Sequence, residues 1–325
     1  MKALNAIVRM VTVGVLMAVI GPVAAQQAYP SKPIHIIVPF PPGGSVDPMA
    51  RMAAQKLAEK WGQSVIVENR AGGNAIIGTD AVAKAAPDGY TILVAGSPHV
   101  ISPSLLTTPY DAIRDFAPVA TIAASRHVLV LNPSLPANNL QELIALAKSK
   151  PGQLNYSSSG SGNTNRLAAE LFSMLAGVKM QHIPYKGAGP AITDLIGGQV
   201  HLSFQIPISV IPHIKSGKLK AIAISGASRA SALPQVPTFA EAGMPDYELA
   251  GWTGILAPAG TPKEIVDKIS SEMARVLAMP EINEKLVNQG LEAFISTPEQ
   301  FAAMMQADMV KFAKIIKAAN IQKEN

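Results

Sequence analysis

Residues Ile34–Arg51, with the sequence IHIIVPFPPGGSVDPMAR, decide more of the fold than any other stretch of the chain. The apolar run Ile34–Phe40 predicts a buried strand that breaks at a Pro/Gly turn, and a helix follows. Such a turn can aim several backbone N–H groups at one point, where the helix N-terminus adds partial positive charge. The stretch therefore predicts an anion site built from backbone.

Two readings of this stretch stay open on the residues alone. The turn could be a plain tight turn without a ligand. Asp47 could be the N-cap that satisfies helix N–H groups. As a ligand contact it would repel a carboxylate but hold an amine or a hydroxyl.

The first 25 residues have the pattern of an export signal. Lys2 and Arg9 supply positive charge, Met10–Ile20 carries no charged residue, and a small-residue site ends at Ala25. The apolar run falls short of the roughly 20 residues that a membrane span needs, which argues against an anchor. We expect a signal peptide over residues 1–25, cleavage after Ala25 and a periplasmic location.

The composition of the mature chain, Gln26–Asn325, limits its partners. Its 300 residues suffice for two domains. Of 27 basic residues in the full chain, 25 remain without Lys2 and Arg9, so the net charge against 22 acidic residues is +3. This small, dispersed charge indicates no nucleic-acid partner and suits an anionic small ligand. The absence of cysteine excludes disulfides, thiolate zinc sites and cysteine nucleophiles.

Strand-like and helix-like segments alternate along the mature chain. Apolar runs predict strands over Ile34–Phe40, Ser64–Glu68, Thr91–Ala95, His127–Leu131, Met180–Ile183, Val200–Gln205 and Leu219–Ser225. Helical spacing predicts helices over Pro48–Lys60, Asn138–Lys150, Arg166–Gly177, Gly189–Gly197, Glu264–Ala278 and Pro298–Ala319. Thr261 and Pro262 have the pattern of an N-cap and a first helical residue. The fold class is α/β, with mainly parallel sheets flanked by helices.

Three further loops of Gly and small polar residues follow predicted strands, at the edge where open α/β sheets bind ligands. Ser157–Thr164 runs directly into a helix, which favours a carboxylate site over a flexible linker. Asn69–Asn74 and Pro184–Pro190 are each open between a cleft wall and an ordinary turn. Tyr185 could donate to a ligand or pack at a domain edge.

The sequence lacks the motifs of common catalytic and cofactor sites. Its six histidines show no metal-ligand spacing, and no nucleophile elbow or nucleotide-binding Gly motif occurs. A Ser/His/Asp trio could still assemble in space, so a secreted hydrolase of small esters, tested at Ser161, remains an alternative. We expect no enzyme, no catalytic residue, no metal and no cofactor.

Six ordered motifs resemble the Bug receptors of tripartite tricarboxylate transport systems: PFPPGGSVDPMAR, DGYTILVAGS, SSSGSGN, PYKGAGPAITDLIGGQV, LPQVPTFAEAG and APAGTP. The resemblance spans essentially the whole mature chain. It implies a monomeric periplasmic solute-binding protein with the type II periplasmic-binding-protein fold, in which two α/β domains enclose a ligand cleft. Here these domains would be residues 26–126 plus 251–325, and residues 127–250.

The resemblance also implies how the ligand is held. Backbone groups of the first loop clasp a carboxylate, and Ser157–Thr164 closes from the other domain. The candidate ligand-binding residues are Phe40, Gly43, Gly44, Ser45, Asp47, Ser97, Ser158, Ser159, Gly162, Asn163, Thr164, Arg166, Tyr185 and Gln205. Two of them depart from the family pattern: Arg166 replaces a frequent His, and Gln205 replaces an acidic or small residue. Arg166 could add a bidentate carboxylate clamp.

The expected function is capture of a small carboxylate-bearing molecule by domain closure, with hinges near Ala124–His127 and Leu249–Gly254. The closed receptor would dock on the integral-membrane permease subunits of a tripartite tricarboxylate transporter. Dicarboxylates, tricarboxylates, acidic amino acids and aromatic acids remain open as ligands. A sensor subunit that works without a transporter is a further alternative.

Overall fold

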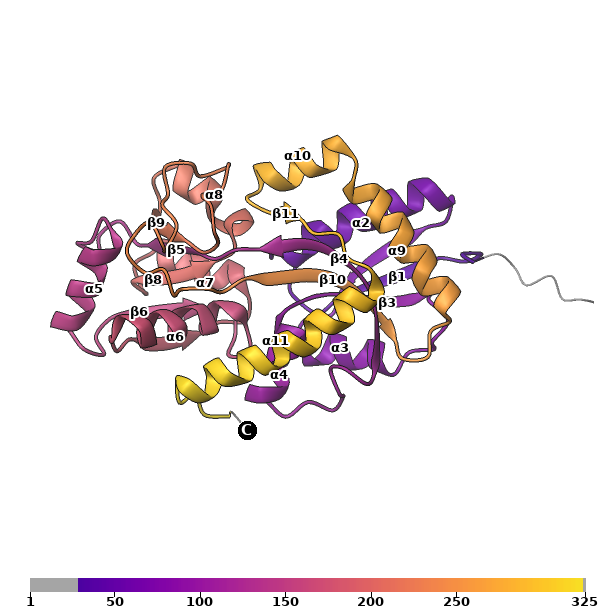
Figure 1. Cartoon of the computed structure of the whole chain (residues 1–325), viewed down its shortest axis with the longest axis horizontal. Coiled ribbons are helices and arrows are strands. Elements are labelled where there is room, and N and C mark those ends of the chain that lie inside the picture. Colours follow the sequence, from indigo (N-terminus) through magenta and orange to yellow (C-terminus); the bar gives the residue numbers. More distant parts are fainter. Residues whose placement is uncertain (1–28, 324–325) are drawn as a thin grey trace, which may run out of the picture. The chain divides into compact units, whose positions relative to one another are not determined.

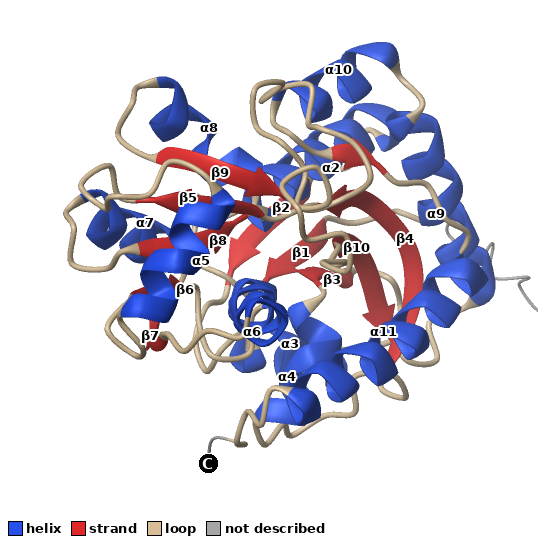
Figure 2. Cartoon of the chain, turned by 60° about the vertical axis from the view of Figure 1, so that its left-hand side comes forward, coloured by secondary structure: helices blue, strands red, loops and turns tan. Residues whose placement is uncertain are grey.

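The computed structural model describes residues 29–323, and two sheets flanked by helices make up its frame (Figures 1 and 2). The first sheet has the strand order β11-β4-β10-β3-β1-β2, and the second has the order β7-β6-β8-β5-β9. The strands of the first sheet are β1 Ile34–Val38, β2 Val65–Asn69, β3 Thr91–Gly96, β4 Phe116–Ser125, β10 Gly251–Pro258 and β11 Glu292–Ala293. Those of the second are β5 Val128–Leu131, β6 Asn155–Ser158, β7 Gln181–Pro184, β8 Leu202–Gln205 and β9 Lys220–Ile224.

Helices cover both sheets. They are α2 Val46–Trp61, α3 Ile76–Ala83, α4 Pro98–Leu105, α5 Leu140–Ser149, α6 Thr164–Ala176, α7 Ala188–Ile196, α8 Pro207–Lys215, α9 Lys263–Leu277, α10 Pro280–Asn288 and α11 Pro298–Ala318. Helices α9 and α11 pack against β4, α2 packs against β1 and β2, and α6 and α7 pack against β6 and β8. Between residues 29 and 323, no helix combines the length and apolar character that crossing a membrane requires.

Strand β1 shows why the opening stretch is apolar without alternation. Ile34, Ile36, Ile37 and Val38 are all fully buried. A strand in the interior of a sheet with helices on both faces is buried on both sides, so most of its residues are apolar. His35 is the exception: it is partly exposed and paired with Glu68. The predicted α/β class is confirmed, and the burial of this strand explains why it could be recognised.

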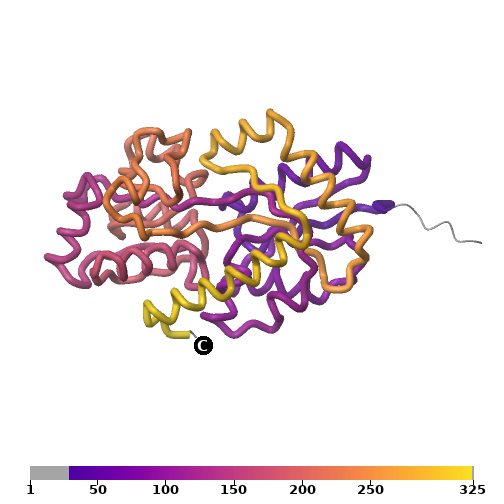
Figure 3. Tube along the Cα trace, in the orientation of Figure 1, coloured from indigo at the N-terminus to yellow at the C-terminus, as the bar shows by residue number. Residues whose placement is uncertain are grey.

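The pairing of the strands is more mixed than we predicted. Strand β1 is parallel to β2 and β3, and β6 is parallel to β7 and β8. In contrast, β10 is antiparallel to β3 and β4, β11 to β4, and β5 to β8 and β9. Every antiparallel pair includes β4, β5 or β10, the strands beside the two points where the chain crosses between sheets (Figure 3).

Several predictions about individual segments need correction. Strands β4, β6, β10 and β11 and helices α3, α4, α8 and α10 were not predicted, and the last two residues of β6 lie inside the segment Ser157–Thr164 that was expected to be loop. Helix α9 begins at Lys263 with Pro262 as its N-cap, and the hydroxyl of Thr261 donates instead to the Pro258 carbonyl at 2.8 Å. The Thr261 cap is therefore wrong. The predicted signal peptide and its cleavage after Ala25 lie outside the described residues.

Candidate functional site

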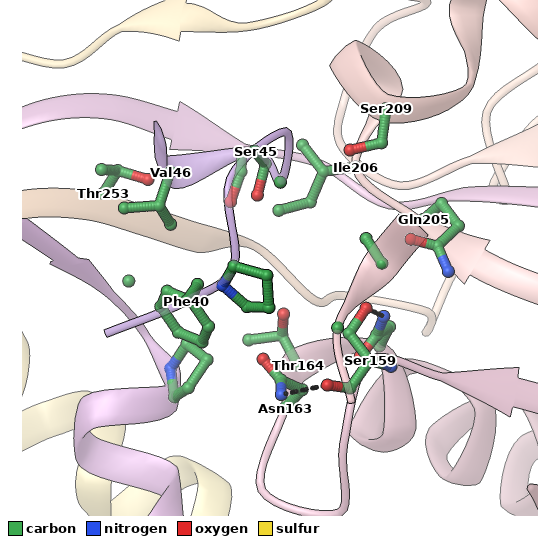
Figure 4. A pocket seen from close by; sticks show the side chains of 18 of the residues that line it. Phe40, Ser45, Val46, Ser159, Asn163, Thr164, Gln205, Ile206, Ser209 and Thr253 are labelled. Atoms are coloured by element: carbon green, nitrogen blue, oxygen red, sulfur yellow. Dashed lines mark hydrogen bonds between the residues drawn. The ribbon is translucent and has the colours of Figure 1, made fainter. Parts of the chain in front are cut away.

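A cavity of about 110 Å³ lies among the loops that leave the two sheets (Figure 4). Its walls come from the segments after β1, β3, β6, β7 and β8, and from the ends of the crossing strands. The lining residues are Phe40, Pro41, Pro42, Gly44, Ser45, Val46, Gly96, Ser97, Pro98, Ser125, His127, Ser159, Asn163, Thr164, Asn165, Gly187, Ala188, Gly189, Pro190, Gln205, Ile206, Ser209, Trp252 and Thr253. The cavity thus lies at the carboxyl ends of strands, where open α/β sheets bind ligands.

The turn after β1 forms one wall of this cavity. Gly43 has a φ angle of +80°, a left-handed conformation that residues with a Cβ rarely adopt. The chain then enters α2 with Ser45 as its N-cap, and both Gly44 and Ser45 line the cavity. The predicted anion turn is therefore placed against an open space rather than against other protein atoms.

Asp47 braces this turn from behind. It is buried in the first turn of α2, and its carboxylate accepts hydrogen bonds from Asn69 Nδ2 at 2.9 Å and Arg51 Nε at 3.1 Å. Asn69 Nδ2 also donates to the Phe40 carbonyl at 3.1 Å, and the Gly43 N–H points to the carboxylate at 3.4 Å. Asp47 makes no N-cap hydrogen bond and is not in the cavity lining. The N-cap prediction is wrong, and the contacts of Asp47 hold the loop instead.

The same contacts determine the ionisation of Asp47. Burial raises the pKa of its carboxyl, but the hydrogen bonds from Arg51 and Asn69 outweigh burial, and the pKa lies below its usual value. Asp47 is therefore ionised at neutral pH. Its charge is neutralised by Arg51 and does not face the cavity.

Five helices begin at the cavity: α2, α4, α6, α7 and α8. Their N-cap residues all line it, and these are Ser45, Ser97, Asn163, Gly187 and Ile206. No side chain caps the first turn of any of the five. In contrast, Asn139 caps α5 and Thr297 caps α11, and neither residue lines the cavity. Helices α4 and α8 begin with Pro98 and Pro207, which have no N–H, and the third-residue N–H groups of α4, α6 and α8 donate to their own N-cap carbonyls. The other N–H groups of these first turns can be offered to a ligand.

The cavity has no charged wall. Within the described part of the chain, its lining contains no Lys, Arg, Asp or Glu. Each helix N-terminus contributes partial positive charge, and a surrounding of low dielectric strengthens this field. The arrangement favours an anion without the help of a cationic side chain.

His127 is a titratable residue of the lining. It is fully buried, and burial lowers its pKa to about 4, so its imidazole is neutral at neutral pH. Its Nε2 atom lies 3.0 Å from Thr164 Oγ1. Its backbone N–H donates to Ser225 Oγ at 2.9 Å, and the Ser225 N–H donates back to the His127 carbonyl at 2.8 Å. His127 is thus fixed on two sides and orients the Thr164 hydroxyl at the start of α6.

The predicted ligand-binding residues divide into two groups. Those in the cavity lining are Phe40, Gly44, Ser45, Ser97, Ser159, Asn163, Thr164 and Gln205. Those outside it are Gly43, Asp47, Ser158, Gly162, Arg166 and Tyr185. For both groups, contact with a ligand stays a prediction.

Side-chain contacts explain two of the residues outside the lining. Arg166 lies outside the cavity lining, and its Nη1 donates to the Ser161 carbonyl at 3.4 Å; the carboxylate clamp stays a prediction. The Tyr185 hydroxyl donates to Asp194 at 2.7 Å, in agreement with the structural alternative for this residue. Both side chains thus make hydrogen bonds to residues of their own half of the protein.

Ser158 and Gly162 are both in close contact with other residues of the protein. The Ser158 hydroxyl is fully buried and lies 2.6 Å from His182 Nε2. A Cβ at Gly162 would lie 2.7 Å from Ser102 Oγ, so glycine permits a close approach there. Ser161, the residue suggested for an ester hydrolase, is buried outside the cavity lining and cannot attack a molecule held in the cavity.

Sequence reasoning missed part of the cavity. Pro41 lies inside the predicted first loop, and Gly187–Pro190 of the predicted loop Pro184–Pro190 also line the cavity. Asn165, next to the predicted loop Ser157–Thr164, could have been found from its position. Ser125, His127, Trp252, Thr253 and Ser209 could not, since no motif marks these crossing strands or the start of α8. No residue of Asn69–Asn74 lines the cavity, and Asn69 acts as a brace.

Comparison with known proteins agrees with this geometry. A model of the tripartite tricarboxylate transporter family receptor matches residues 49–321. Protein BugT of Bordetella pertussis is 39% identical over 94% of this chain and 95% of its own length. These matches confirm the resemblance seen in the ordered motifs.

Two solved structures have the same fold. Rpa4515 of R. palustris, solved with adipate, has a TM-score of 0.88 and 34% identity, over 91% of this chain and 100% of its own. MatC of Rhodopseudomonas palustris, solved with bound malate, has a TM-score of 0.83 and 29% identity, over 89% of this chain and 100% of its own. Both are named with a small dicarboxylate.

Proposed function

The chain belongs to the tripartite tricarboxylate transporter receptor family, and from this premise we propose that its cavity captures a small dicarboxylate. Members of this family are two-domain solute-binding receptors and not enzymes, and so is this chain. The observation that carries the ligand class is the meeting of five uncapped helix N-termini in a cavity without charged side chains. Adipate and malate in the related structures support it.

Backbone donors suit a carboxylate for physical reasons. A carboxylate accepts several hydrogen bonds at once, and bonds from N–H groups to an ionised acceptor are roughly twice as strong as neutral ones. Helix N-termini add their dipoles at the same place. Together these groups replace the water that the anion loses on entering the cavity.

We further propose that binding closes two domains, residues 26–126 plus 251–325 against residues 127–250. The chain crosses between the sheets at Arg126–His127 and again between β9 and β10, close to the hinges expected at Ala124–His127 and Leu249–Gly254. Close contacts across the cavity support a closed form. A Cβ on Gly187 would lie 3.2 Å from Pro41 Cγ, and outside the cavity lining a Cβ on Gly160 would clash with Asn74 Oδ1.

Two further proposed steps are export of the receptor and its docking on a membrane permease. The receptor is exported by the signal peptide, cleaved after Ala25, and acts as a monomer in the periplasm. Its closed form docks on the integral-membrane permease subunits of a tripartite tricarboxylate transporter. Membership in the receptor family supports both steps.

Ligand-induced stabilisation tests the proposal. A dicarboxylate present at 100 times its dissociation constant adds about 2.7 kcal/mol to the free energy of unfolding. We expect this in a thermal-shift and calorimetric screen of C4 to C6 dicarboxylates, with the neutral diamides of the same acids as controls. A screen in which no dicarboxylate binds, or in which the diamides bind equally well, would sink the proposal.

Val46 allows a direct test of a backbone donor. It is the first residue of α2 and lines the cavity, and proline at this position lacks the N–H. Because Ser45 has φ and ψ angles of −67° and −27°, which proline disfavours in the residue before it, the free energy of unfolding of the variant is measured together with its affinity. We expect Val46→Pro to weaken dicarboxylate binding by about tenfold or more, the scale of one hydrogen bond to a charged group. Val46→Ala, which keeps the N–H, should weaken it less.

A further inference from the structure

Gln205 differs from the other polar residues of the cavity in how its side chain is held. It is the last residue of β8, it lines the cavity, and it is only 2% exposed. Its Nε2 atom donates to Ser203 Oγ at 2.8 Å. Ser203 Oγ in turn donates to the Ser157 carbonyl at 2.8 Å. A chain of two hydrogen bonds therefore ties this amide to β6.

The direction of this chain is fixed by chemistry. A backbone carbonyl can only accept, so the single hydroxyl proton of Ser203 goes to Ser157. Toward Gln205, Ser203 Oγ can then only accept, and the group that faces it must be the NH₂ of the amide. In the opposite orientation Gln205 Oε1 would face Ser203 Oγ. The Ser157 carbonyl and Gln205 Oε1 would then compete for the single hydroxyl proton of Ser203. The amide oxygen Oε1 is thus turned away from Ser203.

This orientation presents an acceptor to the cavity. Figure 4 shows the oxygen of Gln205 on the side of Ile206 and the other lining residues, and the nitrogen on the far side. Among the described residues, no donor makes a hydrogen bond to Oε1, and Nε2 is the amide atom that is paired. Oε1 therefore needs a donor from whatever occupies the cavity.

A carboxylate cannot supply this donor. Its oxygens only accept, and an amide oxygen next to them is repulsive. When the cavity closes on a ligand without a donor, Oε1 loses water and gains no partner, which is costly. A hydroxyl on the ligand satisfies it. An ammonium group would also donate, but no acidic side chain lines the cavity to balance its charge, and five helix N-termini disfavour it.

We infer that Gln205 is a specificity-determining residue, and that the receptor selects hydroxy-dicarboxylates over the same acids without the hydroxyl. The inference rests on the proposed function, because the carboxylates are held by the helix N-termini and Gln205 reads the rest of the molecule. Asn163 Nδ2 donates to the Ser159 carbonyl at 3.1 Å, so a second amide oxygen borders the cavity. Variants of Gln205 separate its contribution from that of Asn163.

The test uses matched acids and calorimetry on the full mature chain. The pairs are succinate and malate, glutarate and 2-hydroxyglutarate, and adipate and 3-hydroxyadipate, with aspartate added to the first pair. We expect the hydroxy acid of the best-binding pair to bind about tenfold tighter than its partner, the scale of one satisfied buried acceptor. Aspartate should bind more weakly than malate.

Two variants locate this preference. Gln205→Met keeps the size of the side chain and removes the acceptor, so it should bring the two acids of each pair within about twofold while both still bind. Ser203→Ala leaves Gln205 in place but frees its amide to rotate, so the preference should fall to an intermediate value. Gln141→Met, at a glutamine outside the cavity whose Nε2 donates to the Ala242 carbonyl, is the matched control and should keep the full preference.

Each outcome decides a different point. Equal binding of the paired acids by the unaltered protein, or a preference that persists in Gln205→Met, overturns the inference and leaves the proposed function standing. Tighter binding of aspartate than of malate assigns the donor to an ammonium group and overturns the hydroxyl assignment. If no acid of the panel binds, the proposed function itself fails, and the inference fails with it.

Discussion

Asp47 shows how a charged residue can serve an anion site without facing it. Its carboxylate accepts hydrogen bonds from Arg51, Asn69 and the Gly43 N–H, and the next three residues, Gly44–Val46, line the cavity. The motif PPGGSVD therefore contains both the donors and the brace that positions them. A sequence pattern shows that these residues belong together, but not which of them faces the ligand.

Replacing Asp47 should damage both stability and binding. Asp47→Ala leaves Asn69 and Arg51 without their acceptor, and we expect a loss of about 1–3 kcal/mol in the free energy of unfolding. Dicarboxylate affinity should fall with it. Asp267→Ala removes an exposed partner of Lys263 and is the matched control, with an expected loss below about 0.5 kcal/mol. Urea unfolding and calorimetry of both variants measure this, and equal losses would contradict the bracing role.

The Asp47 carboxylate also makes stability depend on pH. Its pKa is lower in the folded protein than in the unfolded chain, so its contribution is complete above the ordinary aspartate pKa of 3.8. It is lost as the pH falls through the folded pKa. The difference in unfolding free energy between the native protein and Asp47→Ala should therefore shrink below pH 4.

The pKa of Asp308 is shifted in the opposite direction, above its usual value. It accepts a hydrogen bond from Trp252 Nε1 at 3.0 Å, but burial raises its pKa by more than Trp252 and Lys311 lower it. An acid with a raised pKa binds its proton more tightly in the folded state, so stability falls as the pH rises above 3.8. At neutral pH the charge is a cost to the fold.

Asp308→Asn should consequently stabilise the protein at pH 7. The amide oxygen still accepts from Trp252, and the buried charge is gone. We expect a gain below about 1 kcal/mol, which diminishes as the pH is lowered toward 4. Thermal unfolding at a series of pH values checks this, and a variant that is less stable than the native protein at pH 7 would show that the Asp308 charge is needed.

At the scale of elements, the helices differ in whether a side chain caps their N-terminus. Helix α11 has a complete capping box, in which the Thr297 hydroxyl accepts from the Gln300 N–H and Gln300 Oε1 accepts from the Thr297 N–H. The helices at the cavity have no such caps, and neither have α3, α9 and α10, which begin away from it. A missing cap therefore does not mark a binding site by itself, but at the cavity it leaves backbone donors beside the space for a ligand.

This contrast predicts how a cap variant behaves. Thr297→Ala should lower the free energy of unfolding by about 1 kcal/mol and leave dicarboxylate affinity unchanged, because α11 begins outside the cavity. Chemical denaturation and calorimetry provide the two readings. A large loss of affinity in this variant would mean that the cavity depends on α11 in a way its contacts do not show.

The elements that could be predicted are those with a strong local pattern. Strand β1 is a buried aliphatic run, and α11 begins with Thr, Pro and Gln in capping positions. Strands β4 and β10 could not be predicted, since FAPVATIAAS and GWTGILAP are rich in Ala, Gly and Pro. Packing requires glycine at position 254 in β10, because a Cβ there would lie 2.5 Å from the Phe301 ring of α11. Such a requirement comes from distant chain and leaves no local signal.

The residues of the cavity also divide into those that a local sequence pattern predicts and those that it does not. Loops with Gly and Ser next to helix starts were found, because helix N-termini are anion sites by their own chemistry. Residues on the crossing strands, including His127 and Trp252, were missed because their place in the cavity follows from the topology. Arg166 is predicted to be a ligand residue from its charge, but its charge does not show that it lies outside the cavity lining.

At the scale of the whole molecule, closure of the two domains should change the dimensions of the protein. We expect small-angle X-ray scattering to give a smaller radius of gyration with a saturating dicarboxylate than without it, because the ligand favours the closed form. The neutral diamide of the same acid should cause no change. Identical scattering with and without the dicarboxylate would mean that binding does not require hinge motion at Ala124–His127 and Leu249–Gly254.

The central claim is that backbone N–H groups at helix N-termini hold the carboxylate. A crystal structure with the tightest-binding acid of the panel tests it most directly. We predict carboxylate oxygens about 3 Å from first-turn N–H groups of helices that begin at the cavity, α2 among them, with no Lys or Arg side chain in contact. A carboxylate paired with a Lys or Arg side chain, or bound outside the cavity, would contradict it.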